Sequence, residues 1–164
     1  MNNPTPIHIS LDLETLSTAS NAAIVQIGAV TLDGQEFCEY INPKSSEAAG
    51  LDVSVETIQW WNTQDPAIRA QVTGGTTSLA TALGKFLKWC QEVGPLDQIH
   101  LWSYGGDFDL PILRNAYECF TEYPFNYRNH HCLRTLSWAL GLPYIKPARA
   151  HNALEDAIAQ AQLL

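Results

Sequence analysis

Two carboxylates in one short segment, IHISLDLET, are the first residues of the sequence whose types and spacing could do chemistry. Asp12 and Glu14 stand two positions apart there, with no Lys or Arg beside them. Side chains of an extended strand alternate between its faces, so both carboxylates lie on one face, where adjacent like charges repel each other. The pair is therefore either a solvent-exposed strand end or part of a site that binds a cation.

A second acidic segment, YGGDFDLP, follows an apolar stretch and carries Asp107 and Asp109. Pro111 is typical of the first turn of a helix, so N-terminal capping could account for a carboxylate just before it. The two adjacent glycines, however, allow a sharp bend of the backbone or the close approach of a ligand. Position alone does not decide between Asp107 and Asp109.

A third segment, HNALEDA, opens a stretch with helical periodicity. Asn152 is a natural N-cap, and Glu155 three residues later completes a pair of the capping-box type, which gives Glu155 a structural role. Asp156 then has no capping role left. His151 precedes the expected helix, so it can bend over the helix end toward whatever Asp156 binds. A histidine in such a place is a candidate general base.

Carboxylates and a histidine in this combination favour metal-assisted hydrolysis of a phosphodiester. Hard divalent cations such as Mg²⁺ and Mn²⁺ prefer carboxylate oxygens. Two such cations about 4 Å apart can activate water and stabilise the leaving oxygen. The sequence offers no competing Ser-His-Asp arrangement, no Cys and His residues at zinc spacing and no glycine-rich phosphate loop.

The elements that must position these residues alternate between strand and helix patterns. Residues 7–13, 23–32 and 35–42 predict an antiparallel meander of three strands, and residues 98–104 predict a fourth, buried strand. This order predicts an α/β fold with a mixed central β-sheet flanked by α-helices, rather than an all-parallel sheet. Helical patterns cover residues 54–72, with a break at Asp65-Pro66, and then 78–93, 111–120, 133–141 and 153–164.

Composition sets further bounds. The 164 residues, 46% hydrophobic and 16% charged, predict a single globular domain over residues 1–164. No apolar run reaches the ~20 residues of a membrane span, and the first residues lack a secretory signal. Four cysteines without CxxC spacing favour a cytoplasmic protein with reduced thiols. The net charge of −8 disfavours a basic stripe for duplex DNA but suits a site that binds cations.

Taken together, the three acidic segments resemble the motifs of the DEDDh (DnaQ-like) 3′-5′ exonucleases, which have the ribonuclease H-like fold. LDLET is similar to the first motif and HNALEDA to the third, H-x-x-x-x-D. GGDFDLPIL is similar to the second, in which an Asp follows an aromatic residue, and this singles out Asp109 over Asp107. The stretch YGGD departs from the Asn or His that the family often has before this Asp. Two further segments, TIQWWNTQDPAIRAQV and NHHCLRTLSWALG, resemble a branch of prophage-encoded exonucleases and a bacterial exoribonuclease related to RNase T and oligoribonuclease.

The resemblance implies a metal-dependent exonuclease that releases nucleoside 5′-monophosphates from the 3′ end of single-stranded RNA or DNA. It implies that Asp12, Glu14 and Asp156 bind one Mg²⁺ or Mn²⁺ ion. Asp12 would bridge to a second ion that Asp109 helps to hold. His151 would take the proton from the attacking water.

The resemblance also implies contacts with the substrate, and it leaves alternatives open. Adjacent aromatic residues on a helix cannot both face the core, so Trp60 or Trp61 could stack on a base or simply pack in the domain. An inactive ribonuclease H-like binding module and a ribonuclease H-like endonuclease are the alternative functions. The choice between RNA and DNA and the presence of a homodimer stay open. The expected substrate-binding residues are Leu13, Thr15, Trp61, Phe108 and Arg134.

Overall fold

A computed structural model of the chain describes residues 5–143, 147 and 151–164. The described part begins with three strands and four helices, and two more strands and three more helices follow. The elements are β1 (Ile7–Thr15), β2 (Ile24–Thr31), β3 (Glu36–Tyr40), α1 (Pro43–Ala48), α2 (Val55–Asn62), α3 (Pro66–Thr73), α4 (Leu79–Val93), β4 (Ile99–Ser103), α5 (Asp109–Glu118), β5 (His130–Cys132), α6 (Leu133–Leu140) and α7 (Ala153–Ala161).

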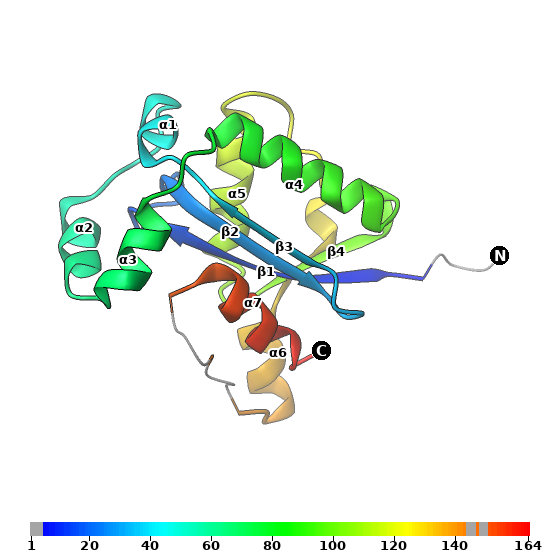
Figure 1. Ribbon diagram of the computed structural model, residues 1–164. Helices are drawn as coiled ribbons and strands as arrows, with labels where there is room; N and C mark the ends of the chain where they lie inside the picture. The colour runs from blue at the N-terminus through cyan, green and yellow to red at the C-terminus, as the bar shows by residue number, and fades with distance from the viewer. Residues whose placement is uncertain (1–4, 144–146, 148–150) are drawn as a thin grey trace.

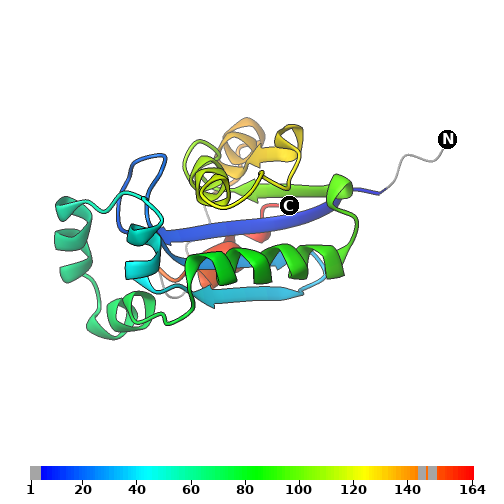
Figure 2. The same cartoon turned by 90° about the horizontal axis from the view of Figure 1, so that it is seen from above.

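The strands form one mixed sheet in the order β3-β2-β1-β4-β5. β1, β2 and β3 are an antiparallel meander, whereas β4 runs parallel to β1 and β5 runs parallel to β4. Helices cover both faces, with α4 and α5 on one side and α6 and α7 on the other (Figure 1, Figure 2). The predicted α/β fold with a mixed central sheet is confirmed.

Two elements differ from the sequence prediction because their signals are weak. β5 has three residues, which is too short for an alternating pattern to appear. The short helix α1 has no counterpart among the helical patterns of the sequence; it begins at Pro43, directly after the strand predicted over residues 35–42, and Asn42 caps it by accepting a hydrogen bond from the Lys44 N–H. A proline in the first turn of a helix loses no hydrogen bond, so it can end one element and begin the next.

The core lies between the sheet and α4 with α5. Ile9 and Leu11 of β1 are completely buried there, together with Phe86 of α4 and Leu113 of α5. The opposite face of β1 carries the acidic side chains and is covered by α7, which packs against β1 and β2. Among the described residues, no helix is both long and apolar enough to cross a membrane. The central strand β1 therefore packs one face into the apolar core and presents its acidic side chains on the other.

Candidate active site

The acidic residues at the end of β1 meet a carboxylate of α7. One carboxylate oxygen from each of Asp12, Glu14 and Asp156 lies within 4.8 Å of the other two. Asp109, the first residue of α5, lines the same cavity and is 5% exposed, whereas Asp107 is exposed and is not part of the lining. The Asp109 carboxylate accepts a hydrogen bond of 3.1 Å from the Leu13 N–H, which ties it to β1.

The close approach of α7 to the sheet depends on a glycine and a buried amide in β2. A Cβ atom at Gly28 would lie 2.2 Å from the carbonyl carbon of Ala153, so a larger residue would push the helix away. Gln26 is completely buried, and its Oε1 accepts a hydrogen bond of 3.0 Å from the Ala153 N–H. These contacts fix the start of α7, and with it Asp156, over the end of β1.

The start of α7 follows the predicted N-cap but not the predicted capping box. Asn152 accepts a hydrogen bond from the Glu155 N–H at 3.3 Å, as a cap does. In a capping box the side chain of Glu155 would accept a hydrogen bond from the N-cap N–H. Here Asp156 does so instead: its Oδ2 accepts hydrogen bonds from the N–H groups of His151 at 3.0 Å and Asn152 at 3.2 Å. The expectation that Asp156 has no capping role is therefore wrong. The left-handed backbone of His151, with φ 68°, turns these N–H groups back toward Asp156.

His151 stands on this turn and lines the cavity of the four carboxylates. Its ring meets the ring of Trp60 edge to face, with the ring centroids 4.8 Å apart and an interplanar angle of 89°. A left-handed conformation is strained for a residue with a Cβ atom and persists where the surroundings hold it. The neighbouring indole and the two hydrogen bonds to Asp156 provide such support.

Burial raises the pKa of every carboxyl in this cluster. For Asp12 the pKa lies well above its usual range because of burial, and the charges of Asp109, Glu14 and Asp156 raise it further. Burial and the neighbouring carboxylates raise the pKa of Glu14 to about 8, and burial raises that of Asp109 to about 7. Burial also raises the pKa of Asp156, against the effect of its N–H donors. The cluster is therefore unfavourable when fully ionised on its own.

The donor set fits a hard divalent cation. Three carboxylates converge, they are largely buried, and none of them pairs with Lys or Arg within the described part of the chain. Such cations prefer carboxylate oxygens, and their charge cancels the repulsion that raises the pKa values. Asp12, Glu14 and Asp156 are thus able to hold a metal ion, and Asp109 is within the same cavity.

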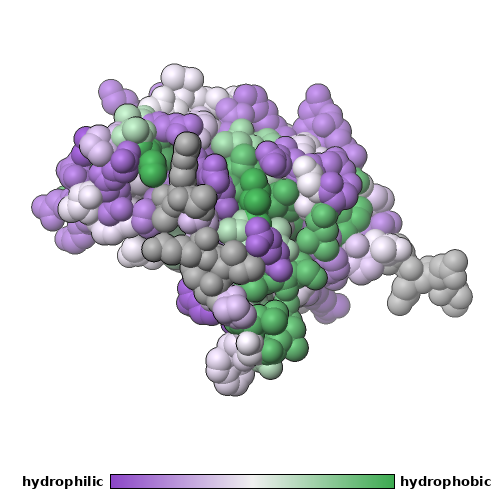
Figure 3. Space-filling model, turned by 60° about the horizontal axis from the view of Figure 1, so that its bottom comes forward, coloured by the Kyte–Doolittle hydropathy of each residue, from purple (hydrophilic) through white to green (hydrophobic). Residues whose placement is uncertain are grey.

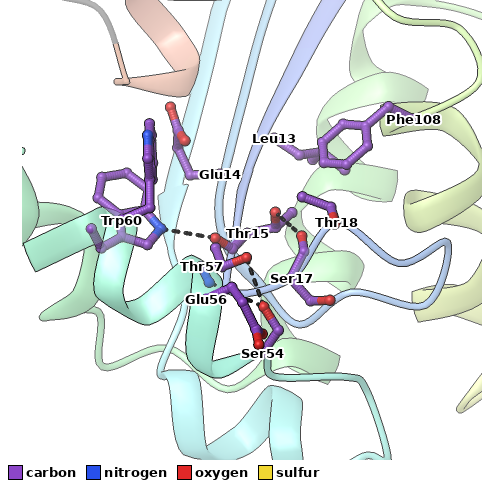
Figure 4. Close-up of a pocket in the computed structure, with 11 residues that line it drawn as sticks. Leu13, Glu14, Thr15, Ser17, Thr18, Ser54, Glu56, Thr57, Trp60 and Phe108 are labelled. Atoms are coloured by element: carbon purple, nitrogen blue, oxygen red, sulfur yellow. Dashed lines mark hydrogen bonds between the residues drawn. The ribbon is translucent and has the colours of Figure 1, made fainter.

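A wider pocket of about 580 Å³ adjoins the carboxylates and shares Leu13, Glu14 and Phe108 with their cavity. Figure 4 shows Trp60 on one side of this pocket and Leu13 with Phe108 on the other. Trp61 also lines it but is 2% exposed, and its indole N–H donates to the Thr15 carbonyl oxygen at 2.9 Å. Of the five expected substrate-binding residues, Leu13, Thr15, Trp61 and Phe108 line this pocket.

Arg134, the remaining expected contact, lies at the carboxylate cavity. Its guanidinium is exposed and stands over the ring of Tyr104, 5.4 Å from the centroid. Arg114, another arginine on a helix, pairs with Glu118 at 2.8 Å and does not line either pocket. Arg134 is therefore the basic residue that the described structure brings to the site.

Sequence reasoning missed Gln160, whose Nε2 donates a hydrogen bond of 2.9 Å to Asp12 Oδ1. A signal for it exists, because Gln160 follows Asp156 by one helical turn and must share its face. Trp60 was considered only together with Trp61, and the structure separates them: Trp60 is 41% exposed at the pocket. Which of two adjacent aromatic residues faces the core depends on the helix phase, which the sequence leaves open.

A five-stranded mixed sheet with carboxylates and a histidine gathered at the end of its central strand agrees with the class that the motifs predict, the ribonuclease H-like nucleases. Within this class, the sequence model of the 3′-5′ exoribonuclease Rv2179c-like domain matches residues 7–164. The chain belongs to this family, and the predicted membership of the DEDDh exonucleases is confirmed. No curated protein sequence matches the chain significantly.

Solved structures of nucleases share the fold at low sequence identity. The nuclease domain of 3′hExo, a DEDDh family member bound to rAMP, has a TM-score of 0.60 and 14% identity, and the match covers 99% of this chain and 92% of that one. Exonuclease I, from the SSB/Exonuclease I structure with the inhibitor CFAM, has a TM-score of 0.64 and 13% identity, over 98% and 41% of the two chains. Cell-death related nuclease 4 (CRN-4) has a TM-score of 0.56 and 14% identity, over 98% and 62%. The chain therefore spans less than two thirds of the latter two proteins, and the likeness establishes the fold.

Proposed function

We propose that the protein is a metal-dependent 3′-5′ exonuclease that hydrolyses single-stranded nucleic acid and releases nucleoside 5′-monophosphates. The observation that carries the proposal is the convergence of the Asp12, Glu14 and Asp156 oxygens within 4.8 Å of one another. Asp109 and His151 line the same cavity, which completes the residue set that the sequence motifs imply. Residues 1–164 then act as a single exonuclease domain, and the expected location is cytoplasmic.

The proposed metal content is two Mg²⁺ or Mn²⁺ ions per site. Asp12, Glu14 and Asp156 would hold one ion, and Asp12 together with Asp109 would hold the other. When bound, such ions lower the pKa of water and offset the charge that develops on a phosphodiester. The raised carboxyl pKa values agree with a site whose ionised form is stable only next to cations.

His151 is the proposed general base of the reaction. Its place on the turn before α7 puts it at the carboxylate cavity, and its ring packs perpendicular to the ring of Trp60. A neutral imidazole there takes a proton from the attacking water, a step that contributes typically 10²–10⁴-fold in rate. His151→Ala should lower kcat by about that factor while calorimetry still detects Mn²⁺ binding. A loss of Mn²⁺ affinity would instead make His151 a ligand or a structural residue.

The wider pocket is the proposed site of the 3′-terminal nucleoside. Its volume of about 580 Å³ suits one small ligand, and Glu14 links it directly to the carboxylate cavity. Leu13 and Phe108 offer apolar surface on one side, and Trp60 offers an exposed aromatic ring on the other, as a stacked base requires. Arg134, beside the carboxylates, is the proposed contact to a phosphate.

A panel of single-stranded substrates tests the function. Matched 5′-labelled RNA and DNA oligonucleotides, and a circular RNA, are incubated with Mg²⁺ or Mn²⁺, with Asp12→Ala as the inactive control. An exonuclease produces a ladder that shortens from the 3′ end, releases 5′-monophosphates and leaves the circle intact. Cleavage of the circle would establish an endonuclease, and binding without hydrolysis would establish an inactive module. RNA is the first substrate to try, because the family is one of exoribonucleases.

A homodimer is also part of the proposal, with α6 as its surface. Trp138 is 83% exposed, Leu140 62% and Leu142 39%. Figure 3 shows hydrophobic residues in the lower part of the molecule, where Figure 1 places α6. Exposed apolar side chains gathered at the end of one helix and directly after it are typical of a surface that binds a partner. Sedimentation velocity of the wild type and of Trp138→Ser should show a dimer that the substitution weakens, and a monomeric wild type would contradict it.

A further inference from the structure

Gln160 has a buried side-chain amide, and only its nitrogen has a hydrogen-bond partner among the described residues. It lies on the face of α7 that carries Asp156, it is 4% exposed, and it lines the carboxylate cavity. Its Nε2 donates to Asp12 Oδ1 at 2.9 Å. Its Oε1 is buried and has no hydrogen-bond partner among the described residues. An amide that served only to hold α7 against the sheet would satisfy both ends, because an orphaned buried acceptor costs free energy.

Two other carboxylates of the cluster, those of Asp109 and Asp156, are also held in place by hydrogen-bond donors. The Leu13 N–H holds Asp109, and the N–H groups of His151 and Asn152 hold Asp156. Those donors belong to the backbone, whereas the donor to Asp12 is a side chain. Asp12 is also the proposed bridge between two cations, so the orientation of its carboxylate matters for both.

We propose that Gln160 is a positioning residue that orients the Asp12 carboxylate for the binding of divalent cations. One lone pair of Oδ1 accepts the Gln160 N–H, so the carboxylate is fixed in rotation and its remaining lone pairs stay available. The amide is neutral, and it therefore stabilises the charged carboxylate without competing with a cation, as a Lys or Arg would. Hydrogen bonds to the ligands of a metal typically change its affinity by 10–100-fold.

The inference rests on the proposed function for its biological meaning, but it is tested by metal binding alone. Gln160→Met keeps the length of the side chain and removes the donor, and Gln160→Leu is a second variant without a donor. Gln162→Met, at the exposed C-cap position of the same helix, is the matched control. Calorimetry measures Mn²⁺ affinity, thermal unfolding in chelator measures stability, and steady-state kinetics on a single-stranded RNA separates kcat from KM.

Gln160→Met and Gln160→Leu should weaken Mn²⁺ binding by about 10–100-fold. They should lower kcat at fixed Mn²⁺ and leave the KM for RNA unchanged. Their metal-free melting temperature should stay near that of the wild type, because loss of the donor to Asp12 is offset by removal of the orphaned acceptor. Mn²⁺ affinity equal to that of the wild type, or loss of the fold in both variants, would overturn the proposal.

The same measurements separate the two proposals. A wild type that binds Mn²⁺ without degrading single-stranded RNA or DNA, and loses that binding in Gln160→Met, refutes the nuclease and supports the role of Gln160. An active wild type whose Gln160→Met variant binds Mn²⁺ equally well supports the nuclease and refutes the role of Gln160. A wild type that binds no Mn²⁺ refutes both.

Discussion

Two polar clusters occupy the same face of the sheet, and they begin four residues apart on β1, at His8 and at Asp12. In the histidine cluster, Trp102 Nε1 donates to His8 Nδ1 at 2.9 Å, and His100 Nδ1 lies 2.7 Å from His131 Nε2. In the carboxylate cluster, Asp12, Glu14 and Asp156 present like charges to one another. Both sets are polar, partly buried and drawn from neighbouring elements.

The two clusters differ in whether their members form hydrogen bonds with one another. The imidazole and indole rings of the histidine cluster exchange hydrogen bonds, and the rings of His100 and His131 stack at an interplanar angle of 4°. The rings of this cluster thus find hydrogen-bond partners in one another. Burial, and then the charges of the neighbouring carboxylates, raise the pKa of Asp12 and of Glu14, so a cation favours their ionisation together. A buried polar cluster that lacks its own counter-charge is therefore the better sign of a functional site.

The largest expected effect comes from breaking the carboxylate cluster at its centre. Asp12→Asn should lower the rate of hydrolysis by about 100-fold or more, because cation contacts are worth several kcal/mol in the transition state. The same change removes repulsion, so the free energy of unfolding in chelator should rise. His8→Asn, on the same face of the strand, should leave the rate near that of the wild type. Rates on labelled RNA and urea unfolding measure both, and a slow His8→Asn variant would contradict the division between clusters.

A smaller effect is expected from pH in the absence of metal. The pKa of Glu14 is about 8 in the folded protein against an ordinary value of 4.5, so the folded state binds protons more tightly than the unfolded state. The free energy of unfolding should therefore fall as pH rises from about 4.5 to about 8. Urea unfolding in chelator across this range measures the fall. Glu14→Gln should flatten the profile and Mn²⁺ should restore stability at high pH, whereas a profile that rises with pH would contradict the assignment.

The smallest effect is expected from the histidine cluster. Trp102→Phe removes the donor to His8 Nδ1 and should cost about 1 kcal/mol of stability, the usual net worth of a hydrogen bond. Mn²⁺ affinity and kcat should not change. Urea unfolding and calorimetry provide the two numbers, and a change in Mn²⁺ affinity would show that the clusters are coupled through β1.

Sequence patterns predicted the strand that carries Asp12 and Glu14 because alternation is a strong local signal. They also predicted the start of α7, because Asn152 is a favoured N-cap. The phase of α2 was out of reach, since the burial of Trp61 rather than Trp60 depends on its hydrogen bond to Thr15 across the fold. The capping role of Asp156 was also out of reach, because it depends on the backbone of His151. Local patterns thus locate the acidic residues, while long-range contacts decide how each one is held.

The hydrogen bond from Gln160 to Asp12 has a consequence for biosynthesis, since it joins residues 148 positions apart in the sequence. Translation proceeds from the N-terminus at about 5–20 residues per second, so β1 emerges on the order of ten seconds before α7 exists. During that interval the nascent chain carries Asp12 and Glu14 without Asp156 or His151. Under the proposed function, a nascent chain that does not yet include α7 is therefore inactive, and activity begins only when α7 docks.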